Sequence, residues 1–219
     1  MLFRSDGATP ENKARIARII ATILYTTRST ALTYYGAEIG STTHTPARKQ
    51  DVRDPIGITG WPKEKGRDGE RTPMQWTADA PAAGFSATAH TWLPIGADYK
   101  TVNVAAQLGQ PDTLLTWYHN LIDLRRGYPA LHDGGIILLD TANPSVLTYV
   151  RTAPAGQQPI FVSVNFTNQD QTIHPNLSAA GLPDHYTWVH MDANIEFNSG
   201  KTLATITLPP YAAIITGVQ

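Results

Sequence analysis

The chain has 219 residues, of which 42% are hydrophobic and 16% charged, and its formal net charge is −1. This composition supports a folded core in one large domain or two small ones, and it argues against global disorder. The near-neutral charge provides no basic surface for nucleic acid. The absence of cysteine excludes disulfides and cysteine-based zinc sites. No apolar run is long enough to cross a membrane.

The clearest helical pattern covers residues 9–28. Thr9 suits the N-cap, Pro10 suits the first helical position, and isoleucine and leucine recur at helical spacing. A short β-prone run over residues 30–35 follows and ends at Gly36. A helix followed by such a strand is the unit of a parallel α/β fold, but one strand needs neighbours that this sequence does not offer.

Residues 37–111 are rich in Pro, Gly and Thr and show little periodicity. An irregular stretch of this length is typical of a functional loop region over an active site, with short helices of its own. A second helix is predicted over residues 112–126, where Gly127 and Pro129 end it.

From Gly134 onward the pattern is that of short strands separated by turn residues. The predicted strands cover residues 136–139, 146–151, 160–166, 186–191, 203–208 and 212–218. This spacing is typical of a small antiparallel β-sandwich. We therefore predict an α/β part over residues 1–133 and an all-β domain over residues 134–219.

The N-terminal residues 1–6 have neither the basic start nor the apolar core of a signal peptide. These observations leave the cellular compartment open, with the cytoplasm favoured.

One segment carries a specific resemblance. Residues 66–76, Gly-Arg-Asp-Gly-Glu-Arg-Thr-Pro-Met-Gln-Trp, resemble the G-R-D-x-x-R-T-P-M-Q-W motif of α-glucosidases in glycoside hydrolase family 13, the α-amylase family. Residues 34–40 are similar to that family's Y-x-G-E-E-I-G motif, and residues 208–212 to its L-x-P-[YW]-x-A strand. Ala37 and Thr77 depart from the acidic residues that the family usually has there.

The resemblance covers nearly the whole chain in order and implies a map of the fold. Residues 9–28 correspond to the seventh helix of a (β/α)8 TIM barrel, residues 30–35 to its eighth strand and residues 112–126 to its eighth helix. Residues 41–111 correspond to the excursion between that strand and helix. The chain is thus expected to be the incomplete, C-terminal part of such a barrel, followed by the β-sandwich.

Retaining glycoside hydrolysis needs a carboxylate nucleophile and a carboxylic acid/base about 5 Å apart. The family places these after its fourth and fifth strands, and a third Asp, in an Asn-His-Asp motif, after the seventh. None of these motifs occurs in the sequence. We therefore expect no catalytic residue, no metal ligand and no cofactor in this chain, and no α-glucosidase activity from it alone.

The resemblance implies four substrate-binding candidates, Tyr35, Glu38, Arg67 and Asp68. Tyr35 and Glu38 lie where a barrel strand ends, which is where such folds place their active sites. Glu38 either lines the substrate cleft or supports the loop by a hydrogen bond or salt bridge, and we favour support. Arg67 and Asp68 either contact sugar hydroxyls or join an ion pair with Glu70 or Arg71 that fixes the loop.

The tryptophans of the long loop also allow two interpretations. Trp61 and Trp92 either stack on sugar rings or anchor the loop, and we favour anchoring. Residues 73–76 are expected to serve packing.

Two hypotheses for the whole chain follow. The first is a C-terminal portion of a retaining α-glucosidase that binds an α-linked gluco-oligosaccharide weakly or not at all in isolation. The alternative is a stand-alone carbohydrate-binding or oligomerising module derived from such an enzyme. Unpaired strand edges and bare apolar faces predict a homo-oligomer or association with the missing N-terminal barrel portion. The sequence leaves open α-1,4 versus α-1,6 preference and hydrolysis versus transglycosylation.

Overall fold

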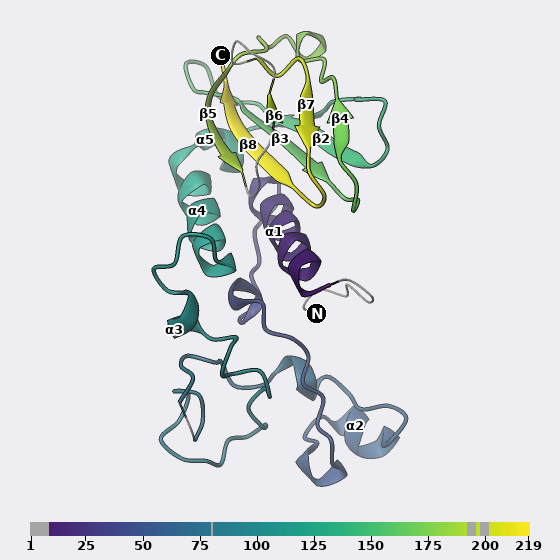
Figure 1. Ribbon diagram of the computed structural model, residues 1–219, viewed down its shortest axis with the longest axis vertical. Coiled ribbons are helices and arrows are strands. Elements are labelled where there is room, and N and C mark those ends of the chain that lie inside the picture. The colour runs from purple at the N-terminus through teal and green to yellow at the C-terminus, as the bar shows by residue number, and fades with distance from the viewer. Residues whose placement is uncertain (1–8, 80, 192–195, 198–201) are drawn as a thin grey trace. The chain divides into compact units, whose positions relative to one another are not determined.

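The computed structural model describes residues 9–79, 81–191, 196–197 and 202–219. Residues 1–6, on which the signal-peptide argument was based, lie outside these ranges. The described chain divides into two compact units, one of residues 33–116 and the other of residues 9–32 together with residues 117–219 (Figure 1). Among the described helices, none has the length and apolar character needed to cross a bilayer.

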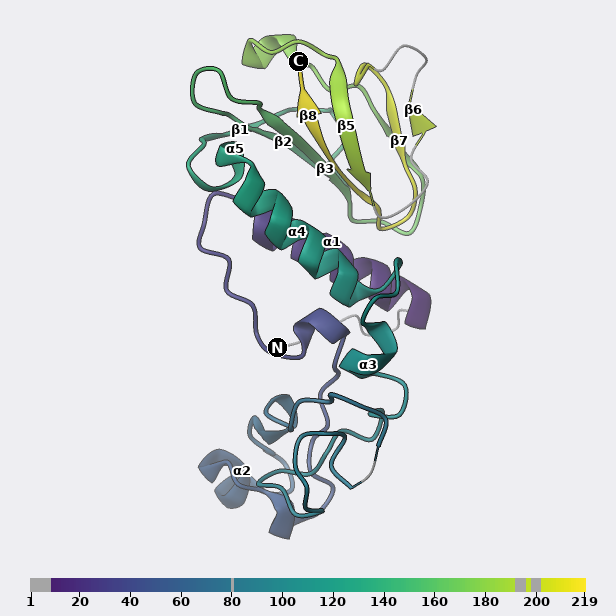
Figure 2. The same ribbon diagram turned by 90° about the vertical axis from the view of Figure 1, so that its left-hand side faces the viewer.

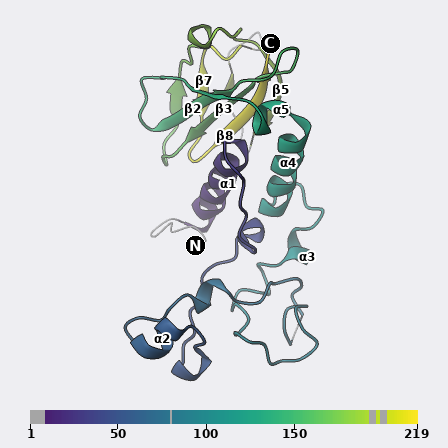
Figure 3. The same cartoon turned by 180° about the vertical axis from the view of Figure 1, so that it is seen from behind.

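The unit of residues 33–116 is mostly irregular backbone interrupted by short helices. The α-helices are α2 (Pro55–Gly60) and α3 (Val104–Gln107), and single 3-10 turns cover Ala37–Ile39, Lys49–Asp51 and Asp68–Glu70. This unit contains the long loop region that the sequence predicted, with the short helices expected there (Figure 3).

The predicted strand over residues 30–35 is wrong, because the structure forms no strand there. A strand exists only through hydrogen bonds to a neighbour, and no described segment pairs with this one. β-propensity alone therefore did not produce a strand.

The second unit contains two long helices and a short one, α1 (Pro10–Thr26), α4 (Leu114–Gly127, from Trp117 onward) and α5 (Pro129–His132). The predicted cap of α1 is confirmed, because the Thr9 side chain accepts a hydrogen bond from the Asn12 amide and Pro10 is the first helical residue. The bounds of both long helices lie within two residues of the predicted ones.

The predicted antiparallel β-sandwich is confirmed. One sheet has the strand order β1-β2-β3-β8-β5 and the other has β4-β7-β6. All paired neighbours are antiparallel. The strands are β1 (Ile136–Leu138), β2 (Val146–Arg151), β3 (Ile160–Asn165), β4 (Gln171–Ile173), β5 (Tyr186–Met191), β6 (Glu196–Phe197), β7 (Ile206–Leu208) and β8 (Ala213–Val218). The short strands β4 and β6 were not predicted.

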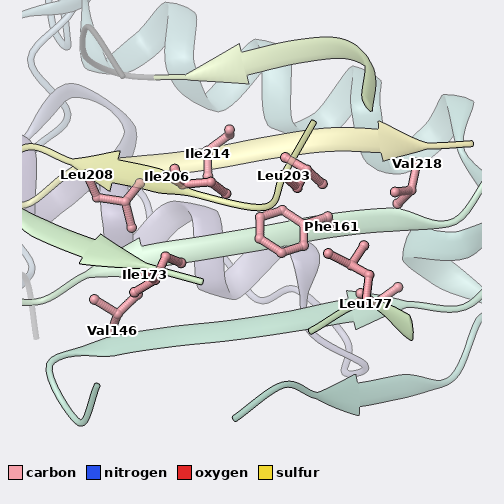
Figure 4. Close-up of a cluster of buried hydrophobic side chains, with 10 residues drawn as sticks. Val146, Phe161, Ile173, Leu177, Leu203, Ile206, Leu208, Ile214 and Val218 are labelled. Carbon is pink, nitrogen blue, oxygen red and sulfur yellow. The ribbon is translucent and has the colours of Figure 1, made fainter. Parts of the chain in front are cut away.

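The main hydrophobic core lies between the two sheets. Phe161 on β3 and Ile214 on β8 meet Ile173 on β4 and Ile206 on β7, and all four side chains are fully buried (Figure 4). Strands with alternating apolar residues on two facing sheets bury them in this way.

The opposite face of the larger sheet packs on α1 and α4, which lie side by side beneath it (Figure 2). The Trp117 indole donates to the Arg18 carbonyl at 3.2 Å, and its ring stacks on His190 of β5 with 4.3 Å between the ring centroids. The Thr26 and Tyr149 hydroxyls share a hydrogen bond, and burial raises the pKa of Tyr149 to about 12. The described unit is thus a layer of helices, a five-stranded sheet and a three-stranded sheet.

Arg151, at the end of β2, is fully buried and makes hydrogen bonds only to backbone carbonyls. Its guanidinium donates to Thr26 at 2.7 Å, Leu131 at 2.9 Å, Gly134 at 2.7 Å and Gly135 at 3.0 Å. It therefore joins the end of α1, α5 and the chain entering the sandwich. The predicted domain boundary near residue 133 stays a prediction, since the compact units group α1 with the sandwich.

Replacing Arg151 by Met is expected to lower the free energy of unfolding by roughly 3–5 kcal/mol, because the buried carbonyls of Thr26, Leu131 and Gly134 lose this donor. Urea denaturation of purified protein measures this. Arg126→Met, at an exposed position on α4, is the control and should cost less than about 0.5 kcal/mol. Equal losses in the two variants would contradict the structural role of Arg151.

His190 predicts an acid-sensitive fold. Burial lowers the pKa of His190 from 6.5 to about 4, and its Nε2 atom has no hydrogen-bond partner among the described residues. Because the folded-state pKa lies below the unfolded-state value, the unfolded chain binds the proton more tightly. The stabilising contribution of neutral His190 is therefore fully present above about pH 6.5. It is lost as the pH drops toward 4, which lowers the free energy of unfolding by up to about 3 kcal/mol.

The measurement is urea denaturation at pH 7 and pH 4.5. His190→Phe, which preserves a ring against Trp117, should remove most of this pH dependence, whereas His119→Gln at an exposed position should keep it. An unchanged pH dependence in His190→Phe would refute the assignment.

Candidate functional site

The candidate site begins with a tight turn at residues 36–41. Gly36 has a φ of +84°, and a Cβ there would meet the Ser41 side chain at 3.0–3.1 Å, so glycine is required. The turn continues through the 3-10 segment Ala37–Ile39 and closes with a hydrogen bond from the Ser41 amide to the Gly36 carbonyl at 2.9 Å. The Gln107 side chain donates to the Ile39 carbonyl at 2.8 Å. The backbone around Glu38 is therefore held on both sides.

Tyr35 connects this turn to the loop of residues 66–76. Its hydroxyl donates to the Thr72 carbonyl at 3.0 Å, and its ring lies against Tyr34 with 5.1 Å between the ring centroids. Burial, together with Tyr34, raises the pKa of Tyr35, while the nearby Arg71 opposes the increase. The phenol thus stays a neutral donor at physiological pH.

Glu38 is half-buried, and its Oε2 atom has no hydrogen-bond partner among the described residues. The supporting bond that the sequence interpretation favoured is not observed at this oxygen. A buried carboxylate oxygen without a donor is costly, and a hydroxyl or a cation that reached it would remove that cost. The assignment of Glu38 to the substrate cleft stays a prediction.

Asp68 fixes the loop of residues 53–68 through backbone amides. Its side chain is 2% exposed, and Oδ2 accepts hydrogen bonds from the Arg53 amide at 2.6 Å and the Asp54 amide at 2.9 Å. A carboxylate in this position replaces the regular hydrogen bonds that an irregular loop lacks.

Asp54 supports the same loop from the other side. One oxygen caps α2 through the Ile56 amide and the other accepts from the Arg67 amide, both at 2.9 Å, with the Arg71 guanidinium 3.5 Å away. The Arg67 and Ile56 amides, more than Arg71, hold the pKa of Asp54 below its usual value. Gly66 has a φ of +69°, and a Cβ there would meet Asp54 at 2.7 Å, which explains the glycine that opens the motif.

Arg67 is the exposed member of this group. Its backbone amide is bound, but its side chain is exposed and makes no hydrogen bond or ion pair to any residue in the described ranges. The ion pair expected with Asp68 or Glu70 is instead formed between Arg71 and Asp54. The Arg67 guanidinium is consequently available to a ligand.

The space beside Tyr35 is small. A hollow of about 10 Å³ lies between residues 35–42 and residues 69–74 and includes neither Glu38, Arg67 nor Asp68 in its lining. Such a volume holds about one water molecule and no sugar ring. The structure therefore brings Tyr35 to the motif loop but forms an open wall and not an enclosed pocket.

A second polar cluster in this unit is formed by His44, Asp98 and Thr42, and it was not predicted from the sequence. His44 Nε2 lies 2.8 Å from Asp98, and the Thr42 hydroxyl donates to the same carboxylate at 3.2 Å. Burial raises the pKa of Asp98, but hydrogen bonds from His44, Gln75 and Thr42 together lower it below its usual value. His44 and Asp98 are 54 residues apart, so no local pattern signalled their contact. In the described residues, no group of His, Cys, Asp or Glu has a metal-binding arrangement.

Two tryptophans of this unit are exposed, Trp92 by 76% and Trp76 by 48%. The Arg53 guanidinium lies over Trp92 at 5.6 Å from the ring centroid, and the Lys65 ammonium over Trp61 at 5.2 Å. The packing predicted for residues 73–76 applies to Gln75, which is 2% exposed, but not to Trp76.

The sequence of this chain is similar to those of known carbohydrate-active enzymes. The sequence model of the α-amylase catalytic domain matches residues 3–134. The chain is 30% identical to an oligo-1,6-glucosidase from Bacillus cereus over 97% of its own length, and 34% identical to a probable α-glucosidase from Rhizobium meliloti over 77%. It spans only 39% and 29% of those two relatives.

Solved structures likewise match nearly all of this chain but less than half of their own length. A variant of the isomaltulose synthase from Erwinia rhapontici, in complex with D-glucose, matches 96% of this chain with a TM-score of 0.75 and 28% identity. The trehalulose synthase from Pseudomonas mesoacidophila matches 97% with a TM-score of 0.78 and 26% identity. The match covers 39% and 40% of those two chains.

Replacing Asp68 by Ala is expected to open the loop of residues 53–68, because two buried amides lose their acceptor. Trypsin cleavage at the arginines and lysines of this loop should accelerate roughly tenfold or more. Mass spectrometry of timed digests locates the cuts. Asp51→Ala removes only an exposed pair with Arg48 and should leave the cleavage rate nearly unchanged. Resistance of Asp68→Ala to trypsin would contradict the anchoring role.

Proposed function

Because the chain belongs to the α-amylase family, glycoside hydrolase family 13, we propose that it supplies the C-terminal part of a retaining α-glucosidase acting on α-linked gluco-oligosaccharides. In this proposal, residues 1–133 are the C-terminal part of a (β/α)8 barrel with its long loop, and residues 30–35 take the place of its eighth strand. Residues 134–219 are the C-terminal β domain. The partner is the remaining part of the barrel or another copy of the chain.

The observation that carries the proposal is the hydrogen bond from Tyr35 to Thr72. It joins the end of the proposed eighth strand to the loop that carries the family motif. Together these segments form one side of a sugar-binding cleft, with the free oxygen of Glu38 and the exposed guanidinium of Arg67 as groups that contact sugar hydroxyls. Asp68 acts by fixing the loop that presents Arg67.

The same geometry supports the absence of catalysis in this chain alone. Asp54 and Asp68 both belong to the motif loop, but they are 4% and 2% exposed and accept hydrogen bonds from backbone amides. A nucleophile and an acid/base must both reach the glycosidic bond. Neither residue is free to do so.

A stand-alone carbohydrate-binding module is the second candidate, and the exposed rings of Trp92 and Trp76 favour it. Aromatic faces bind the apolar faces of sugar rings. The cation over Trp92, however, already occupies one face of that ring. The two candidates differ in the affinity for sugar that they require.

The test uses the 219-residue chain purified from a host without α-glucosidase. We expect no release of 4-nitrophenol from 4-nitrophenyl α-glucoside above the uncatalysed rate, and binding of isomaltose that is millimolar or weaker by NMR titration. Any shifts at high sugar concentration should include Tyr35. Measurable turnover would refute the non-catalytic assignment. Micromolar binding that Trp92→Ala abolishes would favour the module.

A further inference from the structure

A cavity of about 750 Å³ lies at the C-terminal ends of α1 and α4, within the unit that contains the sandwich. Its lining consists of Tyr25, residues 28–31, Ile122, Arg125, Arg126 and His132. A volume of this size accommodates a small organic molecule. The candidate sugar site lies in the other compact unit, so this cavity is a separate feature.

The charged side chains of the cavity are all basic. Three arginines and a histidine line it, and no Asp or Glu of the described chain belongs to the lining. His132 has a carboxylate beside it, because its Nδ1 atom lies 2.9 Å from Asp133. The three arginines form no ion pair with any carboxylate in the described ranges. The cavity therefore attracts anions.

Arg125 is committed to the fold. Its guanidinium donates to the carbonyls of Tyr25 at 2.6 Å, Thr27 at 3.2 Å and Ser29 at 2.6 Å. Carbonyl oxygens at the C-terminal end of a helix carry a partial negative charge that opposes the binding of an anion. Arg125 offsets this charge at the end of α1 and leaves the other two arginines of the cavity to bind a ligand.

Arg28 and Arg126 are these two arginines. Both residues are exposed, and neither side chain makes a hydrogen bond or ion pair with a residue that the structure describes. Arg28 follows α1 and precedes the segment of residues 30–35, and Arg126 lies in the last turn of α4. The two guanidinium groups thus line one cavity and do not depend on how residues 30–35 are paired.

The positive charges of this region act on one another. Burial lowers the pKa of Arg151, and the charges of Arg125 and Arg28 lower it further. Repulsion between like charges raises the free energy of the folded state, and a bound anion reduces it. Because no described carboxylate pairs with Arg28 or Arg126, an anion from solution is the group that supplies the missing charge.

We propose that Arg28 and Arg126 bind the phosphate group of a small organic phosphate, whose remaining part lies in the cavity. A phosphate monoester carries close to two negative charges and three acceptor oxygens, so it can accept paired hydrogen bonds from two guanidinium groups. A carboxylate carries one charge and matches one guanidinium. The Tyr25 ring and the apolar side chains of Ala31 and Ile122 complete the lining and favour an ester over inorganic phosphate.

The test is isothermal titration calorimetry of the 219-residue chain at low salt. The ligands are glucose 6-phosphate, adenosine monophosphate, inorganic phosphate and glucose. We expect at least one ester to bind more tightly than inorganic phosphate, because only an ester also contacts the cavity walls. Glucose, which lacks the phosphate, should give no heat. In NMR spectra of the same chain, the shifts caused by the ester should be largest at residues 28, 29 and 126.

The matched variants separate charge from folding. Arg28→Gln/Arg126→Gln should weaken ester binding at least tenfold, whereas Arg28→Lys/Arg126→Lys keeps both charges and should lose less. Lys13→Gln/Lys100→Gln removes two exposed charges elsewhere and should leave the affinity unchanged. If the Gln variant fails to fold by circular dichroism, the Lys variant and the NMR shifts of the unaltered chain still decide.

Several outcomes would overturn the proposal: no binding of either ester, shifts centred on other residues, or unchanged affinity in the Gln variant. Inorganic phosphate that binds more tightly than both esters would show that the cavity does not hold the organic part. Loss of ester binding in Arg67→Gln would place the phosphate at the motif loop instead. The hydrolysis assay is independent of these readouts, so this inference and the proposed function fail separately.

Discussion

The buried guanidinium of Arg151 is the interaction on which the sandwich unit depends. It carries a charge into the interior without a carboxylate partner and is stabilised there by four carbonyl dipoles. Burial lowers the pKa of Arg151, and Arg125 and Arg28 lower it further. The surrounding backbone must therefore converge on one point, and Gly134 shows how tightly, because a Cβ there would lie 1.8 Å from the Thr152 carbonyl oxygen. The position of α1 against the sheet follows from this convergence.

In the unit of residues 33–116, buried carboxylates organise the backbone as the buried Arg151 guanidinium does in the other unit. The carboxylates of Asp54 and Asp68 accept hydrogen bonds from backbone amides that have no partner in a helix or strand. Residues 53–68 therefore keep a defined shape with little regular structure. This explains the acidic residue and the first glycine of the motif through folding alone. Arg67 is different, because only its amide contributes to the fold and its side chain is exposed. Within the motif, the geometry thus separates the residues that shape the loop from the one that is presented to a ligand.

A structural feature could be predicted from the sequence where its cause lies in neighbouring residues, and not where it depends on distant segments. The strands at residues 146–151 and 186–191 have the predicted bounds, since alternation and flanking turn residues are both local signals. β4 and β6 cover three and two residues, too few for a pattern. Arg151 resembles any polar residue that ends a strand, and its burial depends on carbonyls contributed by segments as far as 125 residues away. The sequence predicted the location of the site at Tyr35. It did not predict the hydrogen bond from the Tyr35 hydroxyl to the Thr72 carbonyl of the motif loop.

The failed strand at residues 30–35 and the arginine-lined cavity occur at the same place in the chain, and each indicates a contact that the described residues do not supply. Natural sequences are locally consistent with their folds, so a β-prone run that finds no partner indicates a missing contact more than a faulty signal. Unpaired backbone at Thr30 to Leu32 and unneutralised charge at Arg28 and Arg126 are two independent deficits of this kind.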